Sequence, residues 1–75
     1  SNVDDMITST LNTVKERIYN DPAISSSNKN KEIITQLYQR GIFNIKDAVL
    51  KVASLLGISK NTVYLHIRNL KEQEN

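Results

Sequence analysis

Residues 59 to 68 carry side chains whose types and spacing suit contact with a nucleic acid. Lysine and arginine can neutralise phosphates or donate to guanine, and asparagine can pair with adenine through two hydrogen bonds. Tyrosine can reach a phosphate, leucine can touch the methyl group of thymine, and hydroxyls at a helix start can help to hold a phosphate. The side chains concerned are Ser59, Lys60, Asn61, Thr62, Tyr64, Leu65 and Arg68.

Two short helices around a glycine turn would position this set. Ala53 lies four residues before Gly57, and its small side chain would let the two helices approach closely at the corner. Gly57 stands where a chain that leaves a helix adopts a left-handed conformation, which glycine reaches without a Cβ clash. Ile58 would fill the corner, and Ser59 is a favoured N-cap whose hydroxyl can accept from the N–H of residue 61 or 62.

The second helix has one apolar stripe and one polar face. Val63, Ile67 and Leu70 recur at the i, i+4, i+7 spacing of a buried stripe. His66 lies beside this stripe, so we interpret it as a half-buried packing residue. The pattern is typical of a helix-turn-helix, whose second helix fits the major groove of DNA.

A Leu-rich helix, a Gly-Ile-Phe joint and the helix-turn-helix form a longer pattern, made up of Ile33, Ile34, Leu37, Gly41-Ile42-Phe43, Ala48-Val49, Val52-Ala53, Leu56-Gly57-Ile58-Ser59 and Thr62-Val63-Tyr64. Through these residues, the chain from Lys31 to Ile67 resembles the C-terminal DNA-binding domain of YheO-like (DauR-like) transcriptional regulators. It departs from their pattern where they usually have a small residue (Asp47), an arginine (Lys60) and a polar or basic residue (Leu65). The resemblance implies an output domain of a longer regulator with an N-terminal PAS-like sensor, which binds DNA as a homodimer.

The remaining chain predicts further helices. One runs from about Val3 to Tyr19 with Asn2 as its cap, and Asp21-Pro22 ends it. A serine-rich loop over 23–28 leads to a second helix from about Lys29 to Arg40, which stops at Gly41. The expected apolar stripes are Val3, Ile7, Leu11, Val14 and Ile18 in the first helix, and Ile33, Leu37 and Ile34 in the second.

Two expectations concern the joint between the second helix and the helix-turn-helix. Phe43 is the only phenylalanine, and we expect it at the centre of the core. Asn44 with Asp47 three residues later resembles a capping box for the helix that follows.

The fold expected is all-α, a small bundle of about four helices that ends in a helix-turn-helix. Residues 1–28 form an amphipathic helix and loop, 29–71 the DNA-binding domain, and 72–75 a polar tail. The stripe of the first helix fits two roles, a cap on the three-helix core or a connector and dimerisation element.

Composition favours binding over catalysis. Seventy-five residues form one small domain, whose core is too limited for a buried active site, so no enzyme is expected. The chain has no cysteine and one histidine, and we expect no metal, no cofactor and no small-molecule ligand in this domain. No apolar stretch reaches the roughly 20 residues of a membrane span, and a soluble, cytoplasmic protein is expected.

Charge distribution agrees with DNA as the partner. Residues 29–68 contain seven lysines and arginines against Glu32 and Asp47, and no acidic residue occurs between Asp47 and Glu72. Lys46 is a further candidate phosphate contact. An alternative is a protein-interaction module that uses Leu65 and Tyr64 as an apolar patch. RNA binding is a weaker alternative, because a helix cannot enter the narrow major groove of an A-form duplex.

Overall fold

The first helix, α1, spans Asn2–Tyr19 in the computed structural model, which describes all 75 residues. Its N-cap is Ser1, whose hydroxyl accepts from the N–H of Asp4 at 3.1 Å. The prediction that Asn2 is the cap was therefore wrong, because the preceding serine takes this role and the helix begins one residue earlier. Four of the five predicted stripe residues are buried, whereas Val3 is 49% exposed, since it lies in the first turn beyond the elements that cover the rest.

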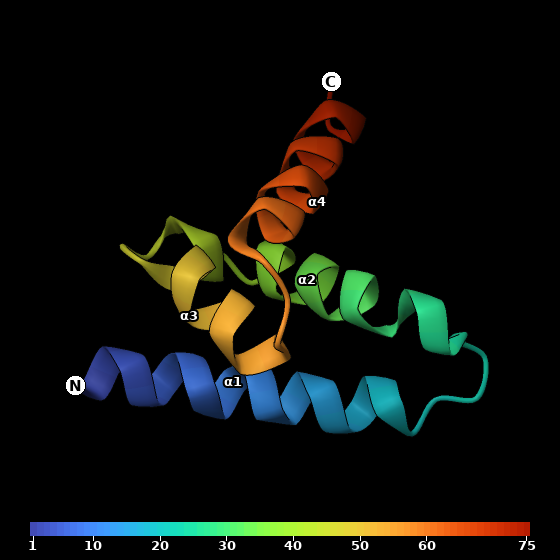
Figure 1. Cartoon of the computed structure of the whole chain (residues 1–75), viewed down its shortest axis with the longest axis horizontal. Helices are drawn as coiled ribbons and strands as arrows, with labels where there is room; N and C mark the ends of the chain where they lie inside the picture. The colour runs from blue at the N-terminus through green and yellow to red at the C-terminus, as the bar shows by residue number, and fades with distance from the viewer.

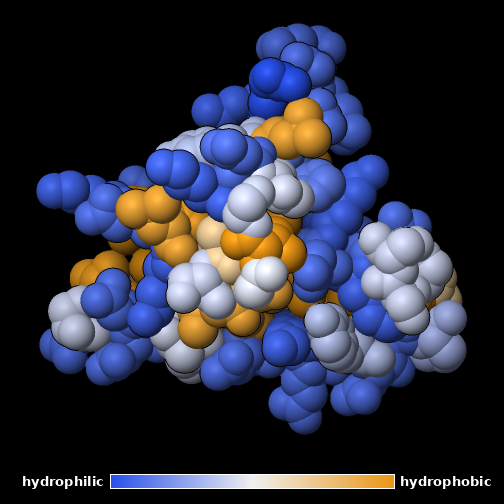
Figure 2. Space-filling view, in the orientation of Figure 1, coloured by the Kyte–Doolittle hydropathy of each residue, from blue (hydrophilic) through white to orange (hydrophobic).

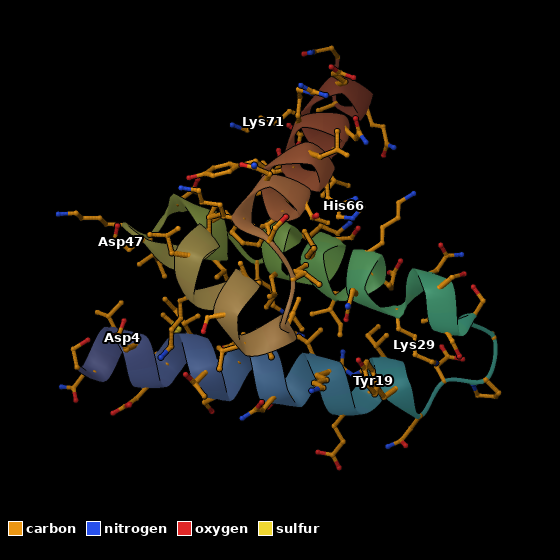
Figure 3. All side chains as sticks on the ribbon, in the orientation of Figure 1. Asp4, Tyr19, Lys29, Asp47, His66 and Lys71 are labelled. Carbon is orange, nitrogen blue, oxygen red and sulfur yellow. The ribbon has the colours of Figure 1, made fainter.

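The turn after α1 is held by a lysine from the following helix. A short 3-10 helix, η1 (Ser26–Asn28), leads into α2, which spans Lys29–Gln39 and ends within one residue of the prediction. The Lys29 ammonium donates to the carbonyls of Ile18 at 3.1 Å and Asp21 at 3.0 Å. A cation therefore satisfies backbone acceptors at the negative end of the α1 dipole. Figure 3 shows Lys29 beside Tyr19 at this end of the molecule.

The joint after α2 differs from the prediction in two respects. Gly41 has a φ of 80° and leads into the 3-10 helix η2 (Ile42–Asn44). Phe43 is only partly buried, because it packs at the border of two apolar clusters rather than at the centre of one. The next helix, α3 (Ala48–Leu56), begins after Asp47, whose backbone is left-handed and whose side chain makes no capping hydrogen bond. The predicted capping box is therefore absent.

Two clusters make up the hydrophobic core. The larger joins α1 to α2, η2 and α3, and the smaller joins α2 and α3 to the last helix, α4 (Lys60–Gln73). Figure 1 shows α1 along the bottom of the view with α2 above it, while α4 projects away from α1 toward the top. The larger cluster contains Ile7, Leu11, Val14, Ile18, Ile33, Leu37, Ile42, Ala48 and Val52, and the smaller contains Ile34, Ala53, Val63 and Ile67.

This arrangement confirms an all-α fold of four α-helices with a helix-turn-helix at its C-terminal end. Helix α2 contributes Ile33, Ile34 and Leu37, each 0% exposed, to the two clusters. It is covered by α1 on one face and α4 on another, so α2 takes the central position that we predicted for Phe43. None of the helices is both long and apolar enough to cross a bilayer.

Candidate nucleic-acid interface

The corner between α3 and α4 has the local structure that the sequence predicts. Gly57 has a φ of 68°, and the N–H of Ile58 donates to the Ala53 carbonyl at 3.1 Å. This bond closes the helix end in a Schellman-type turn, which satisfies a carbonyl that the helix itself leaves free. Ala53 is 4% exposed, and Ile58 packs on the smaller cluster. The close approach of the two helices therefore depends on a small residue and an apolar plug.

Ser59 fixes the start of α4. Its hydroxyl oxygen accepts from the N–H of Thr62 at 3.1 Å and lies 2.9 Å from the Thr62 hydroxyl. The predicted N-cap is confirmed, with Thr62 rather than Asn61 as the donor. One of the unpaired N–H groups of the first turn is thereby satisfied.

One side of α4 is locked into the core. Val63 is 0% and Ile67 7% exposed, whereas Leu70 is only half-buried, because it lies toward the end of α4 that projects beyond the core. His66 is partly buried as predicted, and its Nδ1 is buried without a hydrogen-bond partner.

The remaining side of α4 is exposed and carries the predicted set. Asn61, Leu65 and Arg68 follow one another at i, i+4 and i+7, so they share one line along the helix. All three are exposed, and this line faces away from the buried residues. We call these three residues the outer stripe. It presents an amide, an apolar side chain and a guanidinium in succession.

One flank of the outer stripe adjoins α3. Lys60 and Tyr64 share a shallow groove of about 350 Å³ with Asp47 and Leu50 at the start of α3. Leu50 is 51% exposed. The sequence alone does not indicate this exposure, because it depends on how α3 packs against α1 and α4. Lys46 is exposed in the turn immediately before Asp47, next to this groove but not among the residues that line it.

A larger cleft of about 590 Å³ continues along the same flank toward the end of α4. It lies between Tyr38 of α2 and Tyr64, Lys71 and Glu74 of the C-terminal segment, with Phe43 in its lining. Hydrogen bonding to the carboxylate of Glu74 raises the pKa of Tyr38. Figure 3 shows Lys71 and His66 on opposite flanks of α4, which agrees with the cavity lining, because His66 instead faces Lys31 and Thr35 of α2.

The structure thus brings seven of the eight predicted site residues together on or beside one helix. Figure 2 shows that the projecting end of the molecule is mainly hydrophilic, interrupted by a small hydrophobic patch. Lys46 belongs to the turn before α3, between two residues that line the groove, Ile45 and Asp47, but it does not line the groove itself. Lys29, which the charge count grouped with the basic residues, is engaged with α1 carbonyls and does not contribute a free cation to this surface.

The fold and the corner geometry define a helix-turn-helix domain. The chain belongs to the family described as HTH domain, whose profile matches residues 10–68. It is 48% identical over 71 residues to the Escherichia coli (strain K12) protein named "Uncharacterized protein YheO", and the match covers 95% of this chain and 30% of that protein.

Two further relatives also match nearly the whole chain. The YheO protein of Shigella flexneri shows the same identity and coverage. A Haemophilus influenzae protein, described as uncharacterized, is 40% identical over 74 residues, which is 99% of this chain and 34% of that protein. The chain therefore spans about a third of the length of these relatives, and the predicted resemblance to YheO-like proteins is confirmed. No solved structure matches the chain.

Proposed function

We propose that the chain is the DNA-binding output domain of a transcriptional regulator and reads double-stranded DNA through the major groove with α4. The observation that carries the proposal is the outer stripe on a helix whose opposite side is locked into the core. An α-helix fits the major groove, where base edges present a distinct pattern of donors, acceptors and methyl groups. A rigid helix with exposed amide and guanidinium groups has the chemistry to read that pattern.

Each residue of the stripe has a proposed partner. The Asn61 amide suits the N6 and N7 atoms of adenine, the Arg68 guanidinium suits O6 and N7 of guanine, and Leu65 suits a thymine methyl. The N-terminal position of Asn61 agrees with the way in which recognition helices present their first residues to the bases.

The flanking residues would hold the DNA backbone. Lys60, Tyr64 and Lys46 lie on or near the α3 side of the stripe, while the Ser59 and Thr62 hydroxyls lie at the helix start. Contacts to phosphate fix register without reading sequence. Two copies of the proposed regulator would place their α4 helices on half-sites about one helical turn apart, as dimeric helix-turn-helix proteins do.

The first test is an NMR titration of the labelled domain with a random duplex at two salt concentrations. The proposal expects chemical-shift changes concentrated at residues 59–68 and weakened by salt, because release of counterions from phosphates drives non-specific binding. No shift at low salt would contradict it.

The second test separates base reading from backbone contact. A preferred site is first selected from a randomised duplex pool, and Asn61→Ala is compared with Asn69→Ala, which removes the same amide from another exposed position of α4. Asn61→Ala should cost about 1 to 3 kcal/mol on the preferred site and relax preference at one base pair. Equal weakening of preferred and random DNA would show that Asn61 does not read a base.

A protein-interaction module is the second candidate function. It is favoured by the exposure of Leu50, Tyr64 and Leu65, which are 51%, 52% and 44% exposed, because exposed apolar clusters mark protein contacts. Under this alternative, Leu65→Asn abolishes capture of the partner, and a random duplex leaves the spectrum of the domain unchanged.

A further inference from the structure

Asp47 is the only residue other than glycine with a positive φ, at 63°. This left-handed conformation costs free energy for a residue with a Cβ, and aspartate is one of the few that tolerate it. The structure shows no compensating contact, because the carboxylate makes no capping hydrogen bond, and the one ion pair of the domain joins the N-terminal amine to Asp4. The side chain is exposed, and none of the hydrogen bonds or ion pairs of the domain involves its carboxylate.

The position of Asp47 is unusual for its charge. It lines the groove shared by Lys60 and Tyr64, and it is the only acidic residue between Glu32 and Glu72. Figure 3 shows Asp47 at the turn that precedes α3, at the edge of the molecule. A single negative charge therefore stands beside the flank that, in the proposed function, meets phosphate.

A carboxylate can only accept hydrogen bonds, so a phosphate next to it is repelled whatever the DNA sequence. An amino group on a base edge, N4 of cytosine or N6 of adenine, would instead donate to it. Specificity often arises in this way, from a group that penalises the wrong partner more than the right one.

We propose that Asp47 is a specificity-determining residue, which disfavours non-cognate DNA at the Lys60 flank and is satisfied by a base amino group in the cognate site. This inference rests on the proposed function. The proposal accounts for both observations, the strained position without an internal partner and the isolated negative charge in a groove flanked by Lys60.

The test compares Asp47→Asn with Glu16→Gln. Asparagine keeps the shape of aspartate and also tolerates the left-handed region, so the fold is retained. Glu16 is exposed on α1, which packs on α2 and α3, and both variants remove one negative charge from a chain of net charge +2. Binding of each variant to a random duplex and to a site selected by the wild-type domain is measured by fluorescence anisotropy at two salt concentrations.

For Asp47→Asn we expect binding to the random duplex to tighten roughly three- to tenfold at low salt, with a smaller gain or a loss on the selected site. The ratio of specific to random affinity therefore falls, whereas Glu16→Gln leaves this ratio unchanged. An equal change on both duplexes would overturn the inference, since it would reflect net charge alone. A lower melting temperature with an unchanged affinity ratio would also overturn it, because Asp47 would then serve only the dipole of α3.

These outcomes are distinct from failure of the proposed function. If the wild-type domain binds no duplex at low salt, the proposed function fails, and the inference about Asp47 fails with it. If the wild type binds and Asp47→Asn preserves its affinity ratio, the proposed function stands and only the inference is lost.

Discussion

The two halves of the molecule use their helices differently. In the half built from α1, α2 and the start of α3, apolar stripes meet in a cluster of nine buried residues. In the half that holds α4, four buried residues join three helices, and most of the surface of α4 remains exposed. Because hydrophobic stabilisation scales with buried apolar area, the first half supplies most of the stability, and the second leaves a rigid helix free for a partner.

The largest expected loss of stability comes from a substitution in the half that contains α1 and α2. Leu37→Ala removes a completely buried side chain from the larger cluster and should cost about 2 to 5 kcal/mol, through lost transfer free energy and the cavity left behind. A domain of this size has a total stability of about 4 to 11 kcal/mol, so the variant is close to unfolding. Urea denaturation followed by circular dichroism measures the loss.

Ile67→Ala provides the contrast for Leu37→Ala. Ile67 belongs to the smaller cluster and is 7% exposed. The loss of stability in Ile67→Ala should therefore lie at the lower end of the range given for Leu37→Ala. Hydrogen exchange should then show weakened protection in α4 while α2 stays protected. Equal loss of protection in both helices would show that the two halves form one cooperative unit.

Lys29→Met tests how α1 is tied to α2. The substitution keeps the length of the side chain and removes both hydrogen bonds to α1 carbonyls. Hydrogen bonds to a charged group contribute about 1.5 to 3 kcal/mol, and partial exposure of the site places the expected loss of stability near the lower value. Lys31→Met, which removes an exposed lysine two residues away, is the control. Equal stability of the two variants would contradict the proposed tie.

The sequence predicted the features that depend on neighbouring residues better than those that depend on contacts between residues far apart in the chain. Gly57 and Ser59 were predicted correctly because a left-handed helix end and an N-cap depend on a few neighbouring residues. Phe43 was misplaced because burial depends on how four helices pack. The contacts of Lys29 were also missed, since they reach back 11 residues to α1. The exposure of the outer stripe followed from helical periodicity once the buried face of α4 was identified.

A smaller effect is expected at the start of α4. Ser59→Ala removes the hydroxyl that accepts from the N–H of Thr62 and should cost about 1 kcal/mol. The loss should appear as faster hydrogen exchange in the first turn of α4, with α1 unchanged. Ser54→Ala removes an exposed hydroxyl that caps no helix and serves as the control. If both variants exchange at the wild-type rate in that turn, the cap contributes nothing.

The smallest expected effect concerns the interaction between the end of α4 and α2, and it depends on pH. Hydrogen bonding to Glu74 raises the pKa of Tyr38 above its usual value of 10.0, because the phenol donates only while it is protonated. The pKa of Tyr38 is higher in the folded state than in the unfolded state, so the interaction stabilises the fold below about pH 10. This stabilisation is lost as the pH rises through the raised pKa. NMR titration of the tyrosine rings should show Glu74→Gln lowering the pKa of Tyr38, whereas Glu72→Gln should leave it unchanged. A Tyr38 pKa that is the same in wild type and Glu74→Gln would show that Glu74 does not interact with Tyr38. The end of α4 would then lack this polar contact to α2, and the packing of the smaller cluster alone would join the two helices.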